Sequence, residues 1–450
     1  MEPYRIRLSL MMFGQYIIMG AWLVTLGTYL MASPSLGGLN FPPSYAGWIY
    51  STLAIAGIIS PMFVGLLADR LFSAQKLMAF FHLTGALLLG AAAWWCAGMH
   101  SEIESRYREL AVQEQIEGVS LLEAEQLRDR PDLESLILEA QQRNNTHPEM
   151  QREILHGFWP LFWLMLAYSL AYSLTLTLSS VTTLRNLLEP EKNFSTVRLW
   201  GTVGWMVAGV LVELGLQPIS PMPLFFAAGI SGVVGLYCLT LPSTPPSGKG
   251  RTLGEAFGLP ALKLFADKSF LVMVLCAFAA AVSQQFYVVY TNRYLNELGA
   301  PVPAATQTLA QVAEVICMAI FALLVSRIGL RWMMFMGLVA LALRNGFFAS
   351  EVMWVVVLLG LPLHGFSYAF FSVSASIYVD RKAPDDLRAS AQGINTFITM
   401  GSGTLLGNFL SGRIVEAYTL GNKVIWPEVW LIPTVMCLAI ALVFIGMFRE

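Results

Sequence analysis

Residues 311–325 read QVAEVICMAIFALLV, an apolar stretch interrupted by one glutamine and, three positions later, one glutamate. Its apolar continuation is typical of a helix buried in a membrane. A carboxylate at the centre of such a helix is disfavoured by roughly 3 kcal/mol even on lenient insertion scales. Because residues three apart share one face of a helix, Gln311 and Glu314 are expected to face the protein interior together. The stretch therefore predicts a helical membrane protein with a polar interior.

The composition of the whole chain agrees with this interpretation. Of 450 residues, 56% are hydrophobic and 12% are charged, and the mean hydropathy is +0.62. A soluble globular chain would carry about 25% charged residues, so this class is excluded. Apolar runs of about 20 residues, long enough to cross a membrane as helices, recur almost to the C-terminus. We predict an all-α membrane protein with twelve transmembrane helices, at residues 8–31, 44–67, 77–98, 158–184, 199–216, 223–241, 269–296, 304–325, 332–349, 353–378, 390–416 and 428–448.

The distribution of Lys and Arg between the apolar runs predicts the orientation. Alternate connections are rich in basic residues, whereas the opposite short loops carry little beyond Arg293 and Lys423. By the positive-inside rule, both termini are expected in the cytoplasm. No small-residue cleavage site precedes the first run, so we expect a retained helix and no cleaved signal peptide. The basic residues assigned to the cytoplasmic side are Arg5, Arg7, Arg70, Lys76, Arg185, Lys192, Lys249, Arg251, Lys263, Lys268, Arg327, Arg331, Arg381, Lys382 and Arg388.

A Pro-, Gly- and Ser-rich basic stretch near the middle of the chain divides it in two. It predicts an N-terminal six-helix bundle at 1–241, a cytoplasmic linker at 242–267 and a C-terminal six-helix bundle at 268–450. The halves also echo each other, since EPEKNFSTVRLWGTVG (189–204) and APDDLRASAQG (383–393) share a proline, acidic residues and an arginine opening a helix. Two parallel repeats suit a transporter built around a central site.

Residues 99–156 form a polar insertion between the third and fourth spans. Their spacing predicts two or three amphipathic extramembrane helices, broken near Pro131, on the periplasmic side. The insertion could be a solvated cap, a lid or a domain that docks a partner. Asn144 begins an Asn-X-Thr glycosylation acceptor, which matters only in a eukaryotic secretory route.

A few polar side chains inside the predicted spans are candidates for function. Gln285 offers both a donor and an acceptor, which suits the edge of a heterocycle or a helix contact. His364 is either a hydrogen-bonded helix contact or a proton relay. Arg198 is either an anchor at a helix end or part of a polar stripe, because Thr202 and Trp205 follow it at i+4 and i+7.

Glu314 has three possible roles on chemical grounds. It could pair with Gln311 in a helix contact, load and release a proton, or accept hydrogen bonds from sugar hydroxyls. The five cysteines are odd in number and widely spaced, so neither disulfides nor a metal site are expected. No catalytic constellation and no nucleic-acid surface is apparent, so we expect neither an enzyme nor a cofactor.

Several motifs resemble those of one family. They are GAWLVTLGTYL (20–30), GWIYSTLAIAGIISPMFVGLLADR (47–70), VRLWGTVGW (197–205), AQVAE (310–314), ALRNGFFA (342–349) and IYVDRKAPDDLRASAQG (377–393). As a set they resemble the bacterial nucleoside permeases, the nucleoside:proton symporters of the major facilitator superfamily. The resemblance runs from about residue 8 to residue 448 and excludes the insertion. It implies a multi-pass protein of the bacterial inner membrane, with two six-helix bundles alternating around a midplane site.

The resemblance also implies roles for individual residues. Substrate contacts would fall on Arg198, Thr202, Trp205, Gln285, Gln311, Glu314, His364 and Tyr368. One departure concerns coupling, because Ala369 stands where the family usually carries an aspartate; Leu174, Ser180 and Val288 differ from the family pattern as well. Glu314 therefore remains the candidate for proton coupling.

The prediction is a monomeric, membrane-embedded secondary transporter that imports nucleosides together with protons. Two alternatives stay open. The chain could be an uncoupled facilitator or a carrier of another polar metabolite such as a sugar or nucleobase, which Ala369 motivates. It could also be a non-transporting receptor or scaffold that binds a protein through its insertion.

Overall fold

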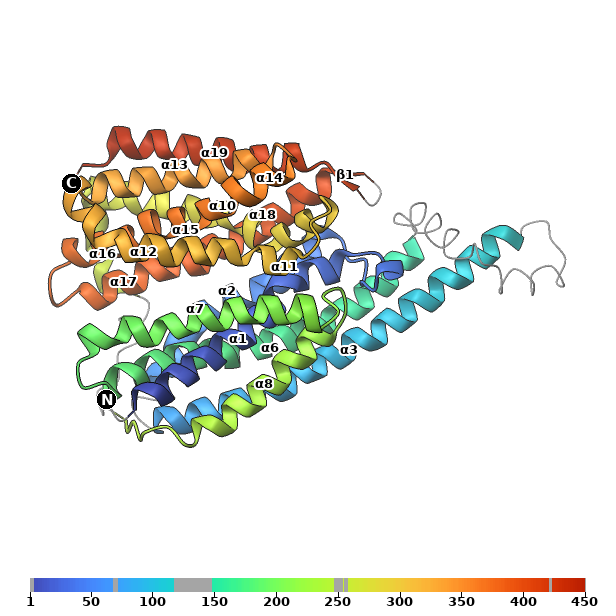
Figure 1. Ribbon diagram of the computed structural model, residues 1–450, viewed down its shortest axis with the longest axis horizontal. Helices are drawn as coiled ribbons and strands as arrows, with labels where there is room; N and C mark the ends of the chain where they lie inside the picture. Colours follow the sequence, from blue (N-terminus) through green and yellow to red (C-terminus); the bar gives the residue numbers. More distant parts are fainter. Residues whose placement is uncertain are drawn as a thin grey trace.

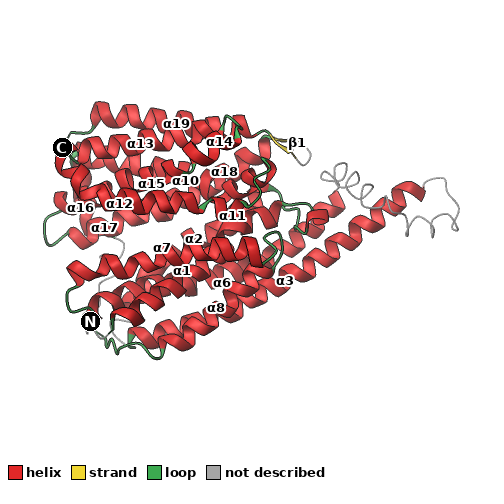
Figure 2. Ribbon diagram, viewed as in Figure 1, coloured by secondary structure: helices red, strands yellow, loops and turns green. Residues whose placement is uncertain are grey.

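The computed structural model describes residues 4–67, 72–116, 148–246, 254, 258–420 and 423–449. Figure 2 shows that these residues are almost entirely helical. The strands in this part are β1 (Thr419–Leu420) and β2 (Lys423–Val424), a short antiparallel pair. The predicted all-α class is therefore confirmed for the described residues.

The helices fall into two groups that lie side by side (Figure 1). Each predicted span lies on helix, although the bounds differ by several residues. The first group contains α1 (Arg5–Met31), η1 (Pro34–Leu36), α2 (Pro43–Leu67), α3 (Ala74–Ile116), α6 (Pro148–Asn186), α7 (Pro190–Gly215) and α8 (Met222–Cys238). The second contains η2 (Leu259–Ala266), α10 (Lys268–Glu297), α11 (Pro303–Thr306), α12 (Thr308–Ile328), α13 (Leu330–Phe348), α14 (Met353–Val355), η3 (Val356–Gly360), α15 (Pro362–Ser367), η4 (Tyr368–Val373), α16 (Ser374–Lys382), α17 (Arg388–Thr396), η5 (Phe397–Gly403), α18 (Thr404–Ala417) and α19 (Trp426–Met447).

Many of these helices are long and apolar enough to cross a membrane. Within the described ranges, eight segments meet that standard and α8 is a shorter apolar helix. The segments are Arg5–Met31, Ala74–Ile103, His156–Asn186, Asn193–Gly215, Lys268–Glu297, Pro303–Ile328, Met353–Lys382 and Trp426–Met447. Their number and length make the chain a multi-pass membrane protein.

The helix α3 extends well past the predicted membrane boundary at residue 98. It contains 43 residues, which at 1.5 Å per residue gives about 65 Å, roughly twice the hydrocarbon thickness. Figure 1 shows α3 projecting beyond the other helices on the side away from both termini. The described ends of the insertion, 99–116 and 148–156, thus continue α3 and α6. The expected break near Pro131 and the Asn144 acceptor lie outside the described residues.

The predicted continuous helix at 353–378 is divided by two π-helical segments, η3 and η4. Pro362 has no backbone N–H to give to the preceding turn. Just before it, the Leu361 amide donates to the Val356 carbonyl at 2.9 Å, five residues back. Such wide turns rotate the residues that follow them, and they occur often at functional sites. The second begins at Tyr368, one of the predicted site residues.

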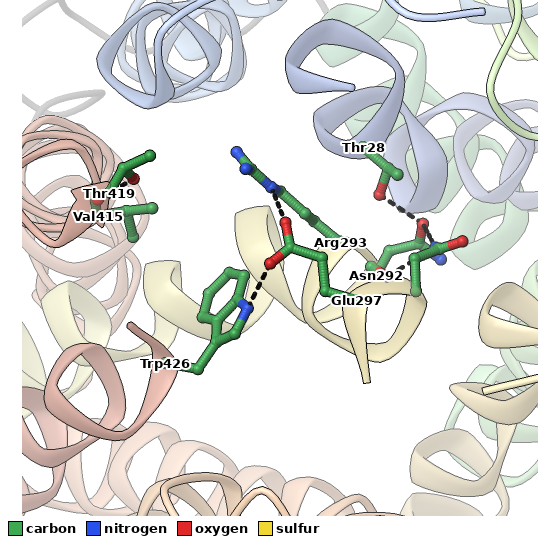
Figure 3. A network of polar contacts seen from close by, with 8 residues as sticks. Thr28, Asn292, Arg293, Glu297, Val415, Thr419 and Trp426 are labelled. Atoms are coloured by element: carbon green, nitrogen blue, oxygen red, sulfur yellow. Dashed lines mark hydrogen bonds and ion pairs between the residues drawn. The ribbon is translucent and has the colours of Figure 1, made fainter. Parts of the chain in front are cut away.

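The two groups are joined by hydrogen bonds at the end of the molecule away from the termini, here called the distal end. Thr28 of α1 donates to Asn292 of α10 at 2.6 Å, as seen in Figure 3. Tyr290 of α10 donates to the Pro43 carbonyl at 2.9 Å. Figure 1 shows α11 lying over the distal end of α7, where the Ala304 amide donates to Glu213 at 2.7 Å.

A small polar brace holds the distal end of α10 in place. Arg293 forms an ion pair with Glu297 at 2.6 Å, one helical turn on. The other Glu297 oxygen accepts from the Trp426 indole of α19 at 2.8 Å (Figure 3). Close backbone approach adds to the closure, because a Cβ at Gly27 would lie 2.5 Å from the Val289 carbonyl oxygen. The two groups are therefore packed tightly at this end.

The opposite end, where both chain termini lie, is called the terminal end. There Asp267 caps α10 by accepting from the Phe270 amide at 2.9 Å, and its other oxygen lies 2.7 Å from the Lys382 ammonium. The hydrogen bonds from Lys382 and Phe270 lower the pKa of Asp267, so the cap stays ionised. These contacts fix the end of the predicted linker to the second group.

Candidate functional site

A buried network of neutral polar groups ties the first group together. The Gln15 amide donates to Thr175 at 2.8 Å, and its oxygen lies 2.9 Å from the His82 ring. Ser231 donates to the His82 backbone carbonyl at 2.9 Å. All four side chains are at most 1% exposed. We therefore interpret His82 as a satisfied contact between α1, α3 and α8.

Four side chains from both groups interact electrostatically across the boundary between them, and we call them the central cluster: Tyr16, Arg198, Glu314 and Tyr368. Arg198 of α7 donates to the Tyr16 hydroxyl of α1, and its guanidinium lies 4.7 Å from the centre of that ring. Glu314 of α12 and Tyr368 of η4 both interact electrostatically with Arg198. A cation of the first group thus interacts electrostatically with an acid of the second.

The backbone of Glu314 is held by close packing against α15. A Cβ at Gly365 would overlap the Glu314 amide nitrogen and lie 2.5 Å from the Ala313 carbonyl carbon. Only glycine permits this approach. The exposed apolar residues Ile316 and Ile320 lie elsewhere on α12, while Glu314 is partly buried. The acid therefore lies away from the exposed apolar residues of α12 and on the side of Arg198 in the first group.

The other predicted site residues differ in their burial and in their contacts. Thr202 and Trp205 follow Arg198 along α7, and Gln311 precedes Glu314 on α12; all three are partly buried. Gln285 is 6% exposed and donates to the Ala281 carbonyl at 3.3 Å and to Thr404 at 3.5 Å. These hydrogen bonds are thus with its own helix and with α18.

A second polar constellation lies within the second group, and we call it the arginine cluster: Gln284, Tyr287, Arg344, Asn345 and His364. Arg344 Nη1 donates to Gln284 Oε1 at 2.9 Å and lies 3.3 Å from His364 Nδ1. Gln284 Nε2 lies 3.2 Å from the same ring nitrogen. Tyr287 stacks on His364 with ring centres 4.6 Å apart, and the guanidinium lies 4.4 Å from the Tyr287 ring centre.

Arg344 is fully buried, and its hydrogen-bond partners are neutral. Its Nε and Nη2 donate to Asn345 Oδ1 at 3.3 and 3.2 Å. Asn345 in turn donates to Ser283 at 3.2 Å, and Cys437 donates to the same hydroxyl at 3.0 Å. The described residues form ion pairs at Arg293–Glu297, Lys382–Asp267 and Arg388–Asp385. Among these residues, no carboxylate pairs with Arg344.

Ala369 occupies an apolar position one residue after Tyr368. It is fully buried and belongs to an apolar cluster with Cys317, Phe321, Met333 and Phe370. The site where the resembling family carries an aspartate is thus filled by apolar packing in this chain.

The sequence did not point to Tyr16, which supplies the hydroxyl facing Arg198. A signal was present, because Tyr16 follows Gln15 within an apolar run. The described residues contain no group of three His, Cys, Asp or Glu side chains placed to hold a metal ion. All five cysteines are buried and free.

Comparisons with known proteins agree on one family. Residues 3–99 and 154–450 match the family model described as nucleoside H+ symporter. The chain is 34% identical to the putative nucleoside transporter YegT of Escherichia coli over 99% of its own length and 93% of that protein. It is 28% identical to the xanthosine permease of Escherichia coli, covering 98% and 95% of the two chains.

The fold comparison gives the same result. A crystal structure of a mutant of the nucleoside transporter NupG matches with a TM-score of 0.79 and 26% identity, covering 99% of this chain and all of that one. The arrangement is that of the major facilitator superfamily. Together with the family model, it shows that the chain is a member of the nucleoside H+ symporter family.

Proposed function

We propose that this protein is a secondary active transporter that imports nucleosides together with protons by alternating access. The observation that carries the proposal is the central cluster, in which a cation of one helix group interacts electrostatically with an acid of the other. A site shared between two bodies changes when they move apart, so a ligand or proton bound there can bias the movement. The family membership supports the same conclusion.

The proposed architecture extends this to the membrane. It has twelve spans in two six-helix bundles, at 1–241 and 268–450, joined by a cytoplasmic linker at 242–267. Both termini would face the cytoplasm of a bacterium, with the monomer in the inner membrane and the insertion in the periplasm. The asymmetry of Lys and Arg between the loops supports this orientation.

In this orientation the distal end is the periplasmic end. The hydrogen bonds Thr28–Asn292, Tyr290–Pro43 and Ala304–Glu213 join the bundles there. These contacts support an inward-facing state, in which the periplasmic entrance is closed. Import would require them to break and form again in each cycle.

The substrate would bind around the central cluster. Gln285 and aromatic side chains would hold the base, because an amide pairs with both donors and acceptors of a heterocycle. Glu314, Gln311 and Arg198 would bind the ribose hydroxyls. The full proposed set is Arg198, Thr202, Trp205, Gln285, Gln311, Glu314, His364 and Tyr368. The partial burial of Thr202, Gln311 and Glu314, which come from both bundles, supports a site between the bundles.

Uptake into proteoliposomes tests the function directly. Purified protein should accumulate labelled uridine when the outside is acidic, and should only equilibrate it when the pH is equal on both sides. Failure to take up any nucleoside would overturn the cargo assignment. Uptake that ignores the imposed gradient would instead support the second candidate, an uncoupled facilitator, which the apolar packing of Ala369 favours.

The closure of the distal end depends on a charged acceptor, which gives a prediction for Glu213→Gln. Hydrogen bonds to charged groups contribute about 1.5–3 kcal/mol, and the Glu213 carboxylate accepts from the Ala304 amide across the bundle boundary. Removing the charge should shift the population about tenfold towards open distal states. Pulsed electron spin resonance between spin labels on the distal ends of α7 and α18 would measure the shift.

Glu428→Gln is the matched control for this experiment. Glu428 is exposed in the first turn of α19 at the same end, so its neutralisation should leave the distance distribution unchanged. Identical distributions for Glu213→Gln and the unmodified protein would mean that this contact does not hold the gate.

A further inference from the structure

The arginine cluster fixes the direction of each of its hydrogen bonds. A guanidinium carries donors and no acceptor, so whatever faces it must accept. Gln284 Oε1, 2.9 Å from Arg344 Nη1, is therefore its oxygen and not its nitrogen. The amide orientation of Gln284 follows, and its NH₂ group is the part that points at His364 Nδ1.

His364 Nδ1 consequently faces two donors. Arg344 Nη1 lies 3.3 Å from it and Gln284 Nε2 lies 3.2 Å from it. A ring nitrogen in this position has to carry a lone pair, so the proton of the neutral ring sits on Nε2. If the ring were an imidazolium, its Nδ1–H would point at two other donors, one of which is cationic. The surroundings therefore favour one neutral tautomer.

The other elements packed around the ring preserve this state. Tyr287 of α10 stacks on it, and Nη1 of Arg344 of α13 lies 3.3 Å from its Nδ1. Glu314 of α12 interacts electrostatically with Tyr287, and its backbone packs against Gly365, the residue after His364. Tyr368 follows one turn later on the same face and belongs to the central cluster. His364 is partly exposed as a residue, and the hydrogen bonds of its ring described above involve Nδ1.

We propose that Arg344 and Gln284 are positioning residues that hold His364 as the neutral Nε2–H tautomer, so that it donates a hydrogen bond to an acceptor on the cargo. This rests on the proposed function and adds a substrate class to it. The complementary ligand is a nucleoside whose base presents a carbonyl oxygen at C4, as uridine does. An amino group at the same place, as in cytidine, would set a donor against a donor.

One consequence concerns the proton. A ring held neutral by two donors does not take up a proton during the cycle, so His364 recognises cargo and is not a relay. Glu314, which interacts with Arg198 of the other bundle, is then the candidate for proton coupling. His364 is thus assigned a role in recognition, in place of the proton relay that its sequence context also allowed.

The tautomer can be measured without any transport assay. In protein labelled with ¹⁵N-histidine, the His364 signals are assigned by comparison with His364→Phe. We expect a bare Nδ1 and a protonated Nε2 that persist between about pH 5 and 8, the range in which an ordinary histidine titrates. Appearance of the imidazolium or of the opposite tautomer in this range overturns the proposal.

Changing the positioning residues tests the cause. Gln284→Glu replaces the donor that faces Nδ1 by an acceptor, and its charge can pair with Arg344, so Nδ1 should become protonated. Arg344→Lys keeps a cationic donor and should retain the neutral ring. An unchanged spectrum in Gln284→Glu overturns the assignment; if that variant does not fold, the spectrum of the unmodified protein still decides the tautomer.

Binding of uridine and cytidine to the purified protein tests the ligand class. We expect about tenfold tighter binding of uridine, because an unpaired donor costs on the order of 1–3 kcal/mol. In His364→Phe, which can still stack on Tyr287 but has no N–H, the ratio should fall towards one. Equal affinities in the unmodified protein, or a preference that survives in His364→Phe, overturns this assignment. Binding of neither nucleoside contradicts the proposed function itself, while the histidine spectrum remains informative.

Discussion

Glu314→Gln is expected to abolish the accumulation of nucleoside against its gradient and to preserve exchange. A pH difference of one unit stores about 1.4 kcal/mol per proton, which corresponds to about tenfold accumulation of a cargo that moves with one proton. Glutamine mimics the protonated acid and cannot release a proton. The variant should therefore carry nucleoside as if always loaded, and its accumulation ratio should fall to about one.

Counterflow in proteoliposomes separates coupling from binding. Vesicles preloaded with unlabelled uridine should exchange it for labelled uridine through the variant, although weaker contact with the ribose would slow the exchange. Glu428→Gln, exposed at the start of α19, should keep full accumulation. Normal accumulation by Glu314→Gln would place the coupling proton on another group.

The positions of the helices could be predicted because each membrane-spanning segment is a long apolar run in the sequence. The run predicted at 8–31 corresponds to α1 (Arg5–Met31), and the run at 269–296 to α10 (Lys268–Glu297). The π-helical segments η3 and η4 could not be predicted in this way. A wide turn changes the number of residues per turn without changing how apolar the run is, so hydropathy alone cannot detect it.

The sequence predicted the site only where a single residue was informative by itself. The cost of burying a charge indicated that Glu314 turns inward, and the structure places it near Arg198 of the other helix group. Partnerships between helices were not predictable, because they depend on how far one helix is displaced along another. Gln284, Arg344 and His364 were visible as separate polar residues, while their common hydrogen-bond direction required the distances between them.

Gly365→Ala should have the largest structural effect of any single methyl group at the site. In an ordinary helix, alanine is favoured over glycine by roughly 0.5–1 kcal/mol. Here the added Cβ would overlap the Glu314 amide nitrogen, and it would lie 2.7 Å from the Glu314 Cα. Backbone atoms cannot rotate away as a flexible side chain can, so α12 and α15 must separate. Such overpacking costs about 1–3 kcal/mol, which exceeds the gain.

The separation should be measurable as both lower stability and lost transport. We expect a reduced thermal midpoint in detergent and at least about tenfold slower uridine exchange. Gly229→Ala is the matched control, since α8 has nothing within 4 Å of the added Cβ, and it should be neutral or slightly stabilising. A Gly365→Ala protein with an unchanged midpoint and unchanged exchange would mean that α12 tolerates displacement here. The position of the acid would then not depend on the close approach of α15 to α12.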